Sequence, residues 1–138
     1  MTSEERLCAE ELIGFIDRAA SPYHVVERSN EILCPVPMNG KERIEAGKMY
    51  SFSLYNTGTI LIAIGENAAK GPLLFACAHT DFPCLRVKPN PVLKEHGYGK
   101  LNIEVYGGLI RNTWMDRPLS LAGAVALRDE DPFTPNLR

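Results

Sequence analysis

The chain has 138 residues, of which 45% are hydrophobic and 23% are charged, and this composition predicts an ordinary soluble protein of one domain, or of one domain and part of another. Lys and Arg number 15 against 17 Asp and Glu, for a formal net charge of -2, and no block of like charge could follow a phosphate backbone or a lipid surface. We therefore expect neither nucleic acid nor a membrane as partner. The N-terminus lacks the pattern of a secretory signal, and the densest apolar run is too short to span a bilayer, which predicts a cytoplasmic protein.

The first predicted element is a helix over residues 2–20. Thr2 and Glu5 match a capping box, in which each side chain satisfies a backbone N–H of the other residue. The apolar residues that follow recur at helical spacing, which predicts a surface helix with one apolar face: Cys8, Leu12, Phe15, Ile16 and Ala19.

A second helix is predicted to begin at the Ser21-Pro22 pair, because serine is a favoured N-cap residue and proline is tolerated at the first helical position. The apolar pattern continues to Leu33, and Pro35 then prevents further helix. His24 lies in the first turn. No potential partner for a ligand or acid-base role is close to it in the sequence, so we interpret it as a capping or packing histidine.

The pattern changes to period two at residue 49, which predicts a β-hairpin. Residues 50, 52 and 54 are apolar and would share one face, residues 56–58 (Asn-Thr-Gly) are typical of a turn, and residues 59–64 predict the return strand. Residues 66–71 are small and polar, and we expect a loop there.

A continuous apolar run over residues 72–78 predicts a central strand that is buried on both faces. Ligands in open α/β sheets bind just beyond the carboxyl ends of strands, and His79 and Asp81 come directly after this run. Residues two apart in extended chain project to the same side, so the carboxylate could orient the imidazole of a metal-bound histidine. Such a pair is common by chance, and by itself it leaves a surface or core histidine as the alternative.

The four cysteines are predicted to be reduced, buried small hydrophobes, because they lie in apolar segments and no secretory context favours disulfides. No two of them form a C-x-x-C pair, so a structural zinc knuckle is not expected. They are Cys8, Cys34, Cys77 and Cys84.

Four sequence blocks together resemble the aspartyl aminopeptidase family, a group of dinuclear zinc exopeptidases. The longest block, Ala-His-Thr-Asp-Phe-Pro-Cys-Leu-Arg-Val-Lys-Pro, is too specific for a chance match. The blocks occur in the order expected of the family: residues 21–24, 78–89, 104–108 and 112–123.

This resemblance implies a metal-dependent hydrolase that removes N-terminal, preferentially acidic, residues from peptides and assembles into large homo-oligomers. It implies two divalent metals, usually zinc, with cobalt or manganese as alternatives. His79 matches the first metal ligand of the family. Asp81 matches the catalytic-site aspartate that holds the ring of that histidine and helps to position the metal.

The chain resembles only the N-terminal part of the family, because the further carboxylates, the second histidine and the glutamate base are expected beyond it. His96, next to Gly97, is predicted to be an exposed loop residue, and residues 129–131 a solvated acidic loop. With the terminal Arg138, the missing motifs suggest a fragment of a longer chain. We therefore expect the isolated chain to be inactive and the remainder of the parent chain to be its main partner.

The predicted architecture is α/β. Residues 1–94 would be the first part of an α/β/α metallo-aminopeptidase domain, and residues 95–138 the opening of an inserted β-rich oligomerisation domain with strands at 101–106 and 119–127. Two other functions are weighed against the aminopeptidase: a non-catalytic oligomerisation or interaction module, and a simple metal-binding module, against which the lack of further clustered ligands argues.

Overall fold

The computed structural model describes residues 2–125. These residues divide into two compact units, one that contains residues 2–80 and 122–125 and one that contains residues 81–121. Helices and β-sheets occur together, which is consistent with the predicted α/β class. The proposed division into residues 1–94 and 95–138 stays a prediction, and the acidic residues 129–131 lie outside the described part of the chain.

Helix α1 (Ser3–Arg18) confirms the first predicted helix and its capping box. The backbone N–H of Thr2 donates to Oε2 of Glu5 at 2.7 Å, and the backbone N–H of Glu5 donates to Oγ1 of Thr2 at 3.2 Å. No residue of the helix is buried. Most of its apolar face is exposed, although Phe15 is half-buried and Ala19, at the C-cap, is buried.

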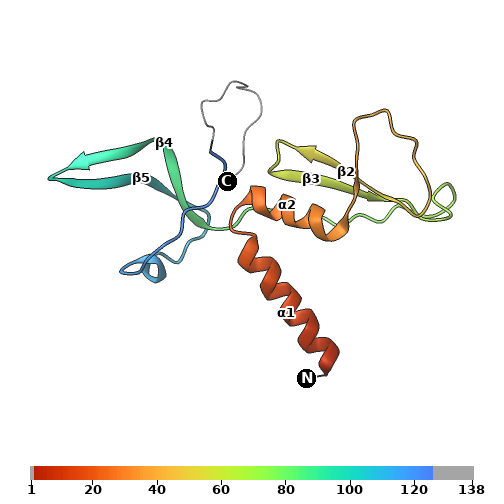
Figure 1. Ribbon diagram of the computed structural model, residues 1–138, viewed down its shortest axis with the longest axis horizontal. Coiled ribbons are helices and arrows are strands. Elements are labelled where there is room, and N and C mark those ends of the chain that lie inside the picture. The colour runs from red at the N-terminus through yellow and green to blue at the C-terminus, as the bar shows by residue number, and fades with distance from the viewer. Residues whose placement is uncertain (1, 126–138) are drawn as a thin grey trace. The chain divides into compact units, whose positions relative to one another are not determined.

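Helix α2 (Pro22–Leu33) confirms the second predicted helix and contacts strand β3 (Gly58–Ala63) of the neighbouring sheet (Figure 1). Ser21 is its N-cap residue, and proline occupies its first turn, as predicted. Val26 is buried within this unit. Cys34 ends the helix in the left-handed conformation, with a φ of 44°.

The first sheet has three strands in the order β1-β2-β3. Strands β2 (Met49–Leu54) and β3 form the predicted antiparallel hairpin, with Tyr50 opposite Ile62. Strand β1 (Val36–Pro37) was not predicted, and it pairs parallel to β2 through Val36 and Tyr50. Its parallel pairing depends on residues more than ten positions away, so no local pattern indicates it.

Tyr50 is the best-buried side chain of this unit, with 2% of its surface exposed. Its hydroxyl donates to the carbonyl of Arg43 at 3.1 Å and accepts from the backbone N–H of Glu45 at 2.9 Å. These bonds attach the loop before β2 to the sheet, because a buried tyrosine hydroxyl needs polar partners.

Residues 72–78 do not form the buried central strand that their apolar run predicts. The segment is irregular, and Leu73, Leu74 and Phe75 are 81%, 92% and 86% exposed. A central strand needs a hydrogen-bonded neighbour on each side and a cover on each face. Neither sheet within residues 2–125 includes this segment, so apolar composition alone does not make it a strand.

The second unit is built on a long antiparallel hairpin of strands β4 (Cys84–Glu95) and β5 (Tyr98–Tyr106) (Figure 1). Strand β5 contains the predicted strand 101–106, whereas β4 was not predicted. The turn residues His96 and Gly97 have φ values of 51° and 81°, as the tight two-residue turns of hairpins require. His96 is exposed, as expected.

A short 3-10 helix, η1 (Arg111–Trp114), follows the hairpin. The predicted strand at 119–127 is wrong over residues 119–125, which have no regular secondary structure, and its last two residues lie outside the described part. Alternating apolar residues form a strand only where a neighbouring strand can accept their backbone hydrogen bonds, and residues 2–125 provide none there.

A large bulge keeps the apolar residues of this hairpin on one face. Strand β4 has four residues between Val87 and Val92, whereas β5 has one between their partners, Ile103 and Leu101. Strand β4 therefore has three extra residues at this point. Because successive side chains of a strand alternate between its two faces, an odd number of extra residues puts Val92 on the same face of the hairpin as Val87. We define the apolar hairpin face by its six members: Leu85, Val87, Val92, Leu101, Ile103 and Val105.

Candidate metal-binding segment

His79, the predicted metal ligand, lies at the end of the irregular segment and is exposed. The next residue is anchored, because Oγ1 of Thr80 donates to the carbonyl of Thr57 at 2.6 Å. Thr57 belongs to the turn between β2 and β3. The histidine is therefore held beside a turn of the first sheet, and not at the end of a central strand as its sequence context predicts.

Asp81, the predicted orienting carboxylate, begins the second unit and is half-buried. Its Oδ2 accepts a hydrogen bond from the hydroxyl of Tyr106, the last residue of β5. The sequence blocks contained Tyr106 but gave no reason to connect it with Asp81. Their separation of 25 residues explains this, since only the hairpin brings them together.

The Tyr106 side chain is also in contact with a cation. The guanidinium carbon of Arg86 lies 5.6 Å from the centroid of the Tyr106 ring, within the range of a cation–π interaction. The hydrogen bond to Asp81 and then the charge of that carboxylate raise the pKa of Tyr106 above 10.0, while the charge of Arg86 opposes the shift. The hydroxyl is therefore a proton donor at neutral pH.

Gly107 allows the chain before β4 to approach the end of β5. Its φ is +73°, and a Cβ placed there would lie 3.3 Å from Cα of Pro83. Glycine accepts this left-handed conformation without the steric cost that other residues incur. The close approach brings the Asp81-Phe82-Pro83 segment to the residue that carries the donor hydroxyl.

The described residues contain few potential metal donors that lie together. Within residues 2–125, no group of three or more His, Cys, Asp or Glu side chains is arranged to hold a metal ion. Zinc in proteins takes three or four protein ligands. The described residues therefore do not make a complete zinc site, and His79 is one candidate donor among ligands that must come from elsewhere.

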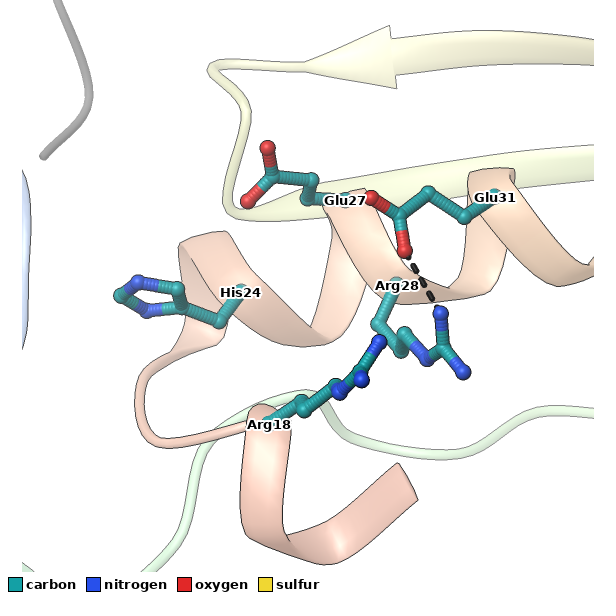
Figure 2. Close-up of a pocket in the computed structure, with 5 residues that line it drawn as sticks. All are labelled: Arg18, His24, Glu27, Arg28 and Glu31. Atoms are coloured by element: carbon teal, nitrogen blue, oxygen red, sulfur yellow. Dashed lines mark hydrogen bonds and ion pairs between the residues drawn. The ribbon is translucent and has the colours of Figure 1, made fainter. Parts of the chain in front are cut away.

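Neither of the other described histidines, His24 and His96, belongs to a group of three or more potential metal ligands within residues 2–125. A hollow between α1 and α2 includes His24 (Figure 2), but Nδ1 of His24 lies 2.7 Å from Oγ of Ser21 at the helix start. Of the two predicted roles, this side-chain contact agrees with packing rather than capping, because no side chain caps the backbone at the start of α2. The hollow also contains an ion pair of 2.7 Å between Arg28 and Glu31, and its volume of about 180 Å³ is below the roughly 300 to 1,000 Å³ of ligand pockets. Its lining residues are Arg18, His24, Glu27, Arg28 and Glu31.

None of the four cysteines is paired in a disulfide, and the prediction that they are buried is wrong for three of them. Cys84 alone is half-buried, at the start of β4. The others lie on α1, just after α2 and in the irregular segment, where residues 2–125 offer no neighbouring surface to cover them: Cys8, Cys34 and Cys77.

Residues 15–136 match the family described as Aminopeptidase I zinc metalloprotease (M18). The chain belongs to the M18 aminopeptidase family. This assignment confirms the predicted resemblance to a metal-dependent aminopeptidase, and the description of the M18 family agrees with the expected zinc. Among residues 2–125, no helix has the length and apolar character needed to cross a membrane.

Individual M18 proteins show how much of the family the chain represents. It is 36% identical to a probable M18 family aminopeptidase 2 of Clostridium novyi over 137 residues, which cover 94% of the chain and 32% of that protein. It is 32% identical over 139 residues to aspartyl aminopeptidase 1 of Schizosaccharomyces pombe, covering 95% of the chain and 29% of that protein. Its fold is similar to that of aminopeptidase I from Borrelia burgdorferi, with a TM-score of 0.76 at 23% identity over 94% of the chain and 34% of that structure. The chain thus spans about a third of the length of these M18 proteins.

Proposed function

We propose that the chain is the N-terminal part of a zinc-dependent aminopeptidase that removes N-terminal, preferentially acidic, residues from peptides. The match of residues 15–136 to the M18 family, which includes the His-Thr-Asp segment at 79–81, carries this proposal. The name of the S. pombe relative, an aspartyl aminopeptidase, supports the acidic preference. The same proposal includes two divalent metals, a homo-oligomeric assembly and a cytoplasmic location.

The proposed roles of the two site residues follow from their chemistry. His79 supplies one nitrogen ligand, and Asp81 acts on the ring of His79 by fixing its orientation and the nitrogen that carries the proton. The remaining ligands and the general base belong to the rest of the parent chain. This division agrees with the absence of a three-residue ligand group within residues 2–125.

Metal counting and steady-state kinetics on the full-length protein test these roles. His79→Ala should lose one bound metal per chain and essentially all activity, because a direct ligand is removed. Asp81→Asn keeps the shape of the side chain but loses its charge, and it should weaken metal affinity or rate by roughly 10- to 100-fold. Substrates with N-terminal Asp and Ala, compared on the wild type, measure the acidic preference.

His24→Ala and His96→Ala are matched controls, since each removes an imidazole to which the proposal assigns no metal. Both variants should keep the full metal content. A His79→Ala protein with a full metal complement and near-normal turnover would contradict the site assignment, as would loss of metal from His96→Ala.

A non-catalytic interaction role for the chain by itself is the second candidate. It is favoured by the apolar hairpin face, where Val92, Leu101 and Val105 are exposed. Zinc-dependent peptidase activity of the full-length protein, abolished by His79→Ala, would decide for the aminopeptidase. A full-length protein that assembles but neither binds zinc nor cleaves peptides would decide for the interaction role.

A further inference from the structure

We propose that the hollow between helices α1 and α2 binds one oxyanion, a carboxylate or a phosphate group, between the side chains of Arg18 and Arg28. The two arginines come from different helices of the same unit and line the same hollow (Figure 2). This inference goes beyond the proposed function, because it requires neither zinc nor peptidase activity.

One edge of the Arg28 guanidinium group has no partner within residues 2–125. Nη1 donates to Oε2 of Glu31 at 2.7 Å, whereas Nε is buried and has no hydrogen-bond partner. Nε and Nη2 lie along the same edge of the planar group, and two parallel N–H groups of this kind bind a carboxylate or a phosphate with two hydrogen bonds. The edge that suits an oxyanion is therefore left open beside the nitrogen that Glu31 already occupies.

The unpartnered Nε–H of Arg28 is costly unless a ligand accepts its hydrogen bond. A buried donor loses its hydrogen bonds to water, and the cost is larger when the donor belongs to a charged group. Only 27% of the Arg28 side chain is exposed, and Nε lies in the covered part. An oxyanion in the hollow would accept from this N–H and replace the lost bond.

Arg18 supplies a second positive charge at the hollow. It lies in the last turn of α1, and among residues 2–125 its guanidinium group forms no hydrogen bond or ion pair. Figure 2 shows its side chain extending toward Arg28. Two like charges that face one hollow repel each other, and an anion between them converts this repulsion into attraction.

The acidic residues of the hollow do not take this place. Glu31 is bound to Nη1 of Arg28, and Figure 2 shows Glu27 directed away from Arg18. The volume of about 180 Å³ is more than ten times the roughly 10 to 15 Å³ that one water molecule requires. The hollow therefore has room for a carboxylate or phosphate group, although it is too small for a drug-sized ligand.

Thermal unfolding of the 138-residue chain, followed by the circular dichroism of its helices, tests the site with inorganic phosphate as the probe. Sodium phosphate is compared with sodium chloride at equal pH and ionic strength. The dissociation constant follows from the rise of the melting temperature with phosphate concentration. Arg28→Lys keeps the charge but removes the open edge, and Arg18→Gln removes the second charge. Each variant should bind phosphate about 10-fold or more weakly.

Arg6→Gln is the matched control, because Arg6 lies on the same helix as Arg18 but pairs with Glu10 at 2.9 Å and does not line the hollow. Its affinity for phosphate should equal that of the wild type. Phosphate also stabilises folded proteins generally, through its exclusion from their surface. An equal rise of the melting temperature in the wild type and all three variants would therefore be this general effect, and it would overturn the inference.

The same variants of the full-length protein identify the source of the oxyanion. A small free anion is the ligand if phosphate raises the melting temperature of wild type and Arg6→Gln but not that of Arg18→Gln. A carboxylate from the rest of the parent chain is the ligand if phosphate has no effect, while Arg18→Gln and Arg28→Lys lower the melting temperature more than Arg6→Gln does. A full-length protein that shows neither behaviour would overturn the inference.

Discussion

Replacing Gly107 with alanine should destabilise the 81–121 unit, whereas the same change at Gly108 should not. The φ of Gly107 is +73°, and its added Cβ would meet Cα of Pro83 at 3.3 Å and Cβ of Pro83 at 3.4 Å. No positive φ is found for Gly108, and a Cβ there would meet nothing within 4 Å. The two adjacent glycines therefore form a matched pair that differs in conformation and in space.

The magnitude follows from two opposing effects. A left-handed conformation costs a residue with a Cβ about 1 to 2 kcal/mol, and the reduced freedom of the unfolded chain offsets about 0.4 to 1 kcal/mol of this. The contact with Pro83 adds to the cost, because its nearest atom belongs to the backbone and cannot swing aside. We expect Gly107→Ala to lower the free energy of unfolding by about 1 to 2 kcal/mol, and Gly108→Ala to leave it unchanged or raise it by up to about 1 kcal/mol.

Urea unfolding of the 138-residue chain, followed by tryptophan fluorescence, measures this difference. Trp114 is the only tryptophan and lies in the same unit as both glycines, so the signal reports on the affected part. All variants are compared at one protein concentration. Equal unfolding free energies for the two alanine variants would refute the reasoning from backbone conformation.

Three further predictions concern activity, association and pH. The isolated chain should not cleave an N-terminal aspartyl substrate with added zinc, cobalt or manganese, because one candidate ligand cannot hold a catalytic metal; turnover that His79→Ala abolishes would contradict this. The chain should self-associate through exposed apolar surface. Ile103→Lys on the apolar hairpin face should therefore reduce the mass measured by light scattering more than Tyr98→Lys, which changes the opposite face of the hairpin. A wild-type chain that is a monodisperse monomer would contradict this prediction. The pKa of Tyr106 is raised on folding by its hydrogen bond to Asp81, so the stability from this pair should be complete at neutral pH, begin to decline near the unfolded pKa of about 10, and be lost as the pH rises through the higher folded value. The difference between the unfolding midpoints of wild type and Tyr106→Phe, followed from pH 7 to 11, should therefore shrink only at the alkaline end, and a difference that stays constant would show that the hydroxyl is not the cause.

The sequence by itself determined the elements that form from neighbouring residues. The capping box of Thr2 and Glu5 predicted the start of α1, the Ser21-Pro22 pair predicted the start of α2, and period-two alternation predicted the hairpin of β2 and β3. These signals succeed because the hydrogen bonds of a helix or a tight hairpin close between residues that are close in sequence. The family was also predictable, since the block around His79 is a continuous stretch of chain.

Only the tertiary structure decided which apolar segments become strands and which distant side chains meet. The apolar run at 72–78 has the composition of a buried strand, but a strand forms only where another backbone accepts its hydrogen bonds. The three extra residues of β4 and the pairing of Cys84 with Tyr106 depend on a register that no local pattern specifies. The contact between Tyr106 and Asp81 follows from that register and from the left-handed Gly107, because residues far apart in the sequence meet only when the backbone between them has folded.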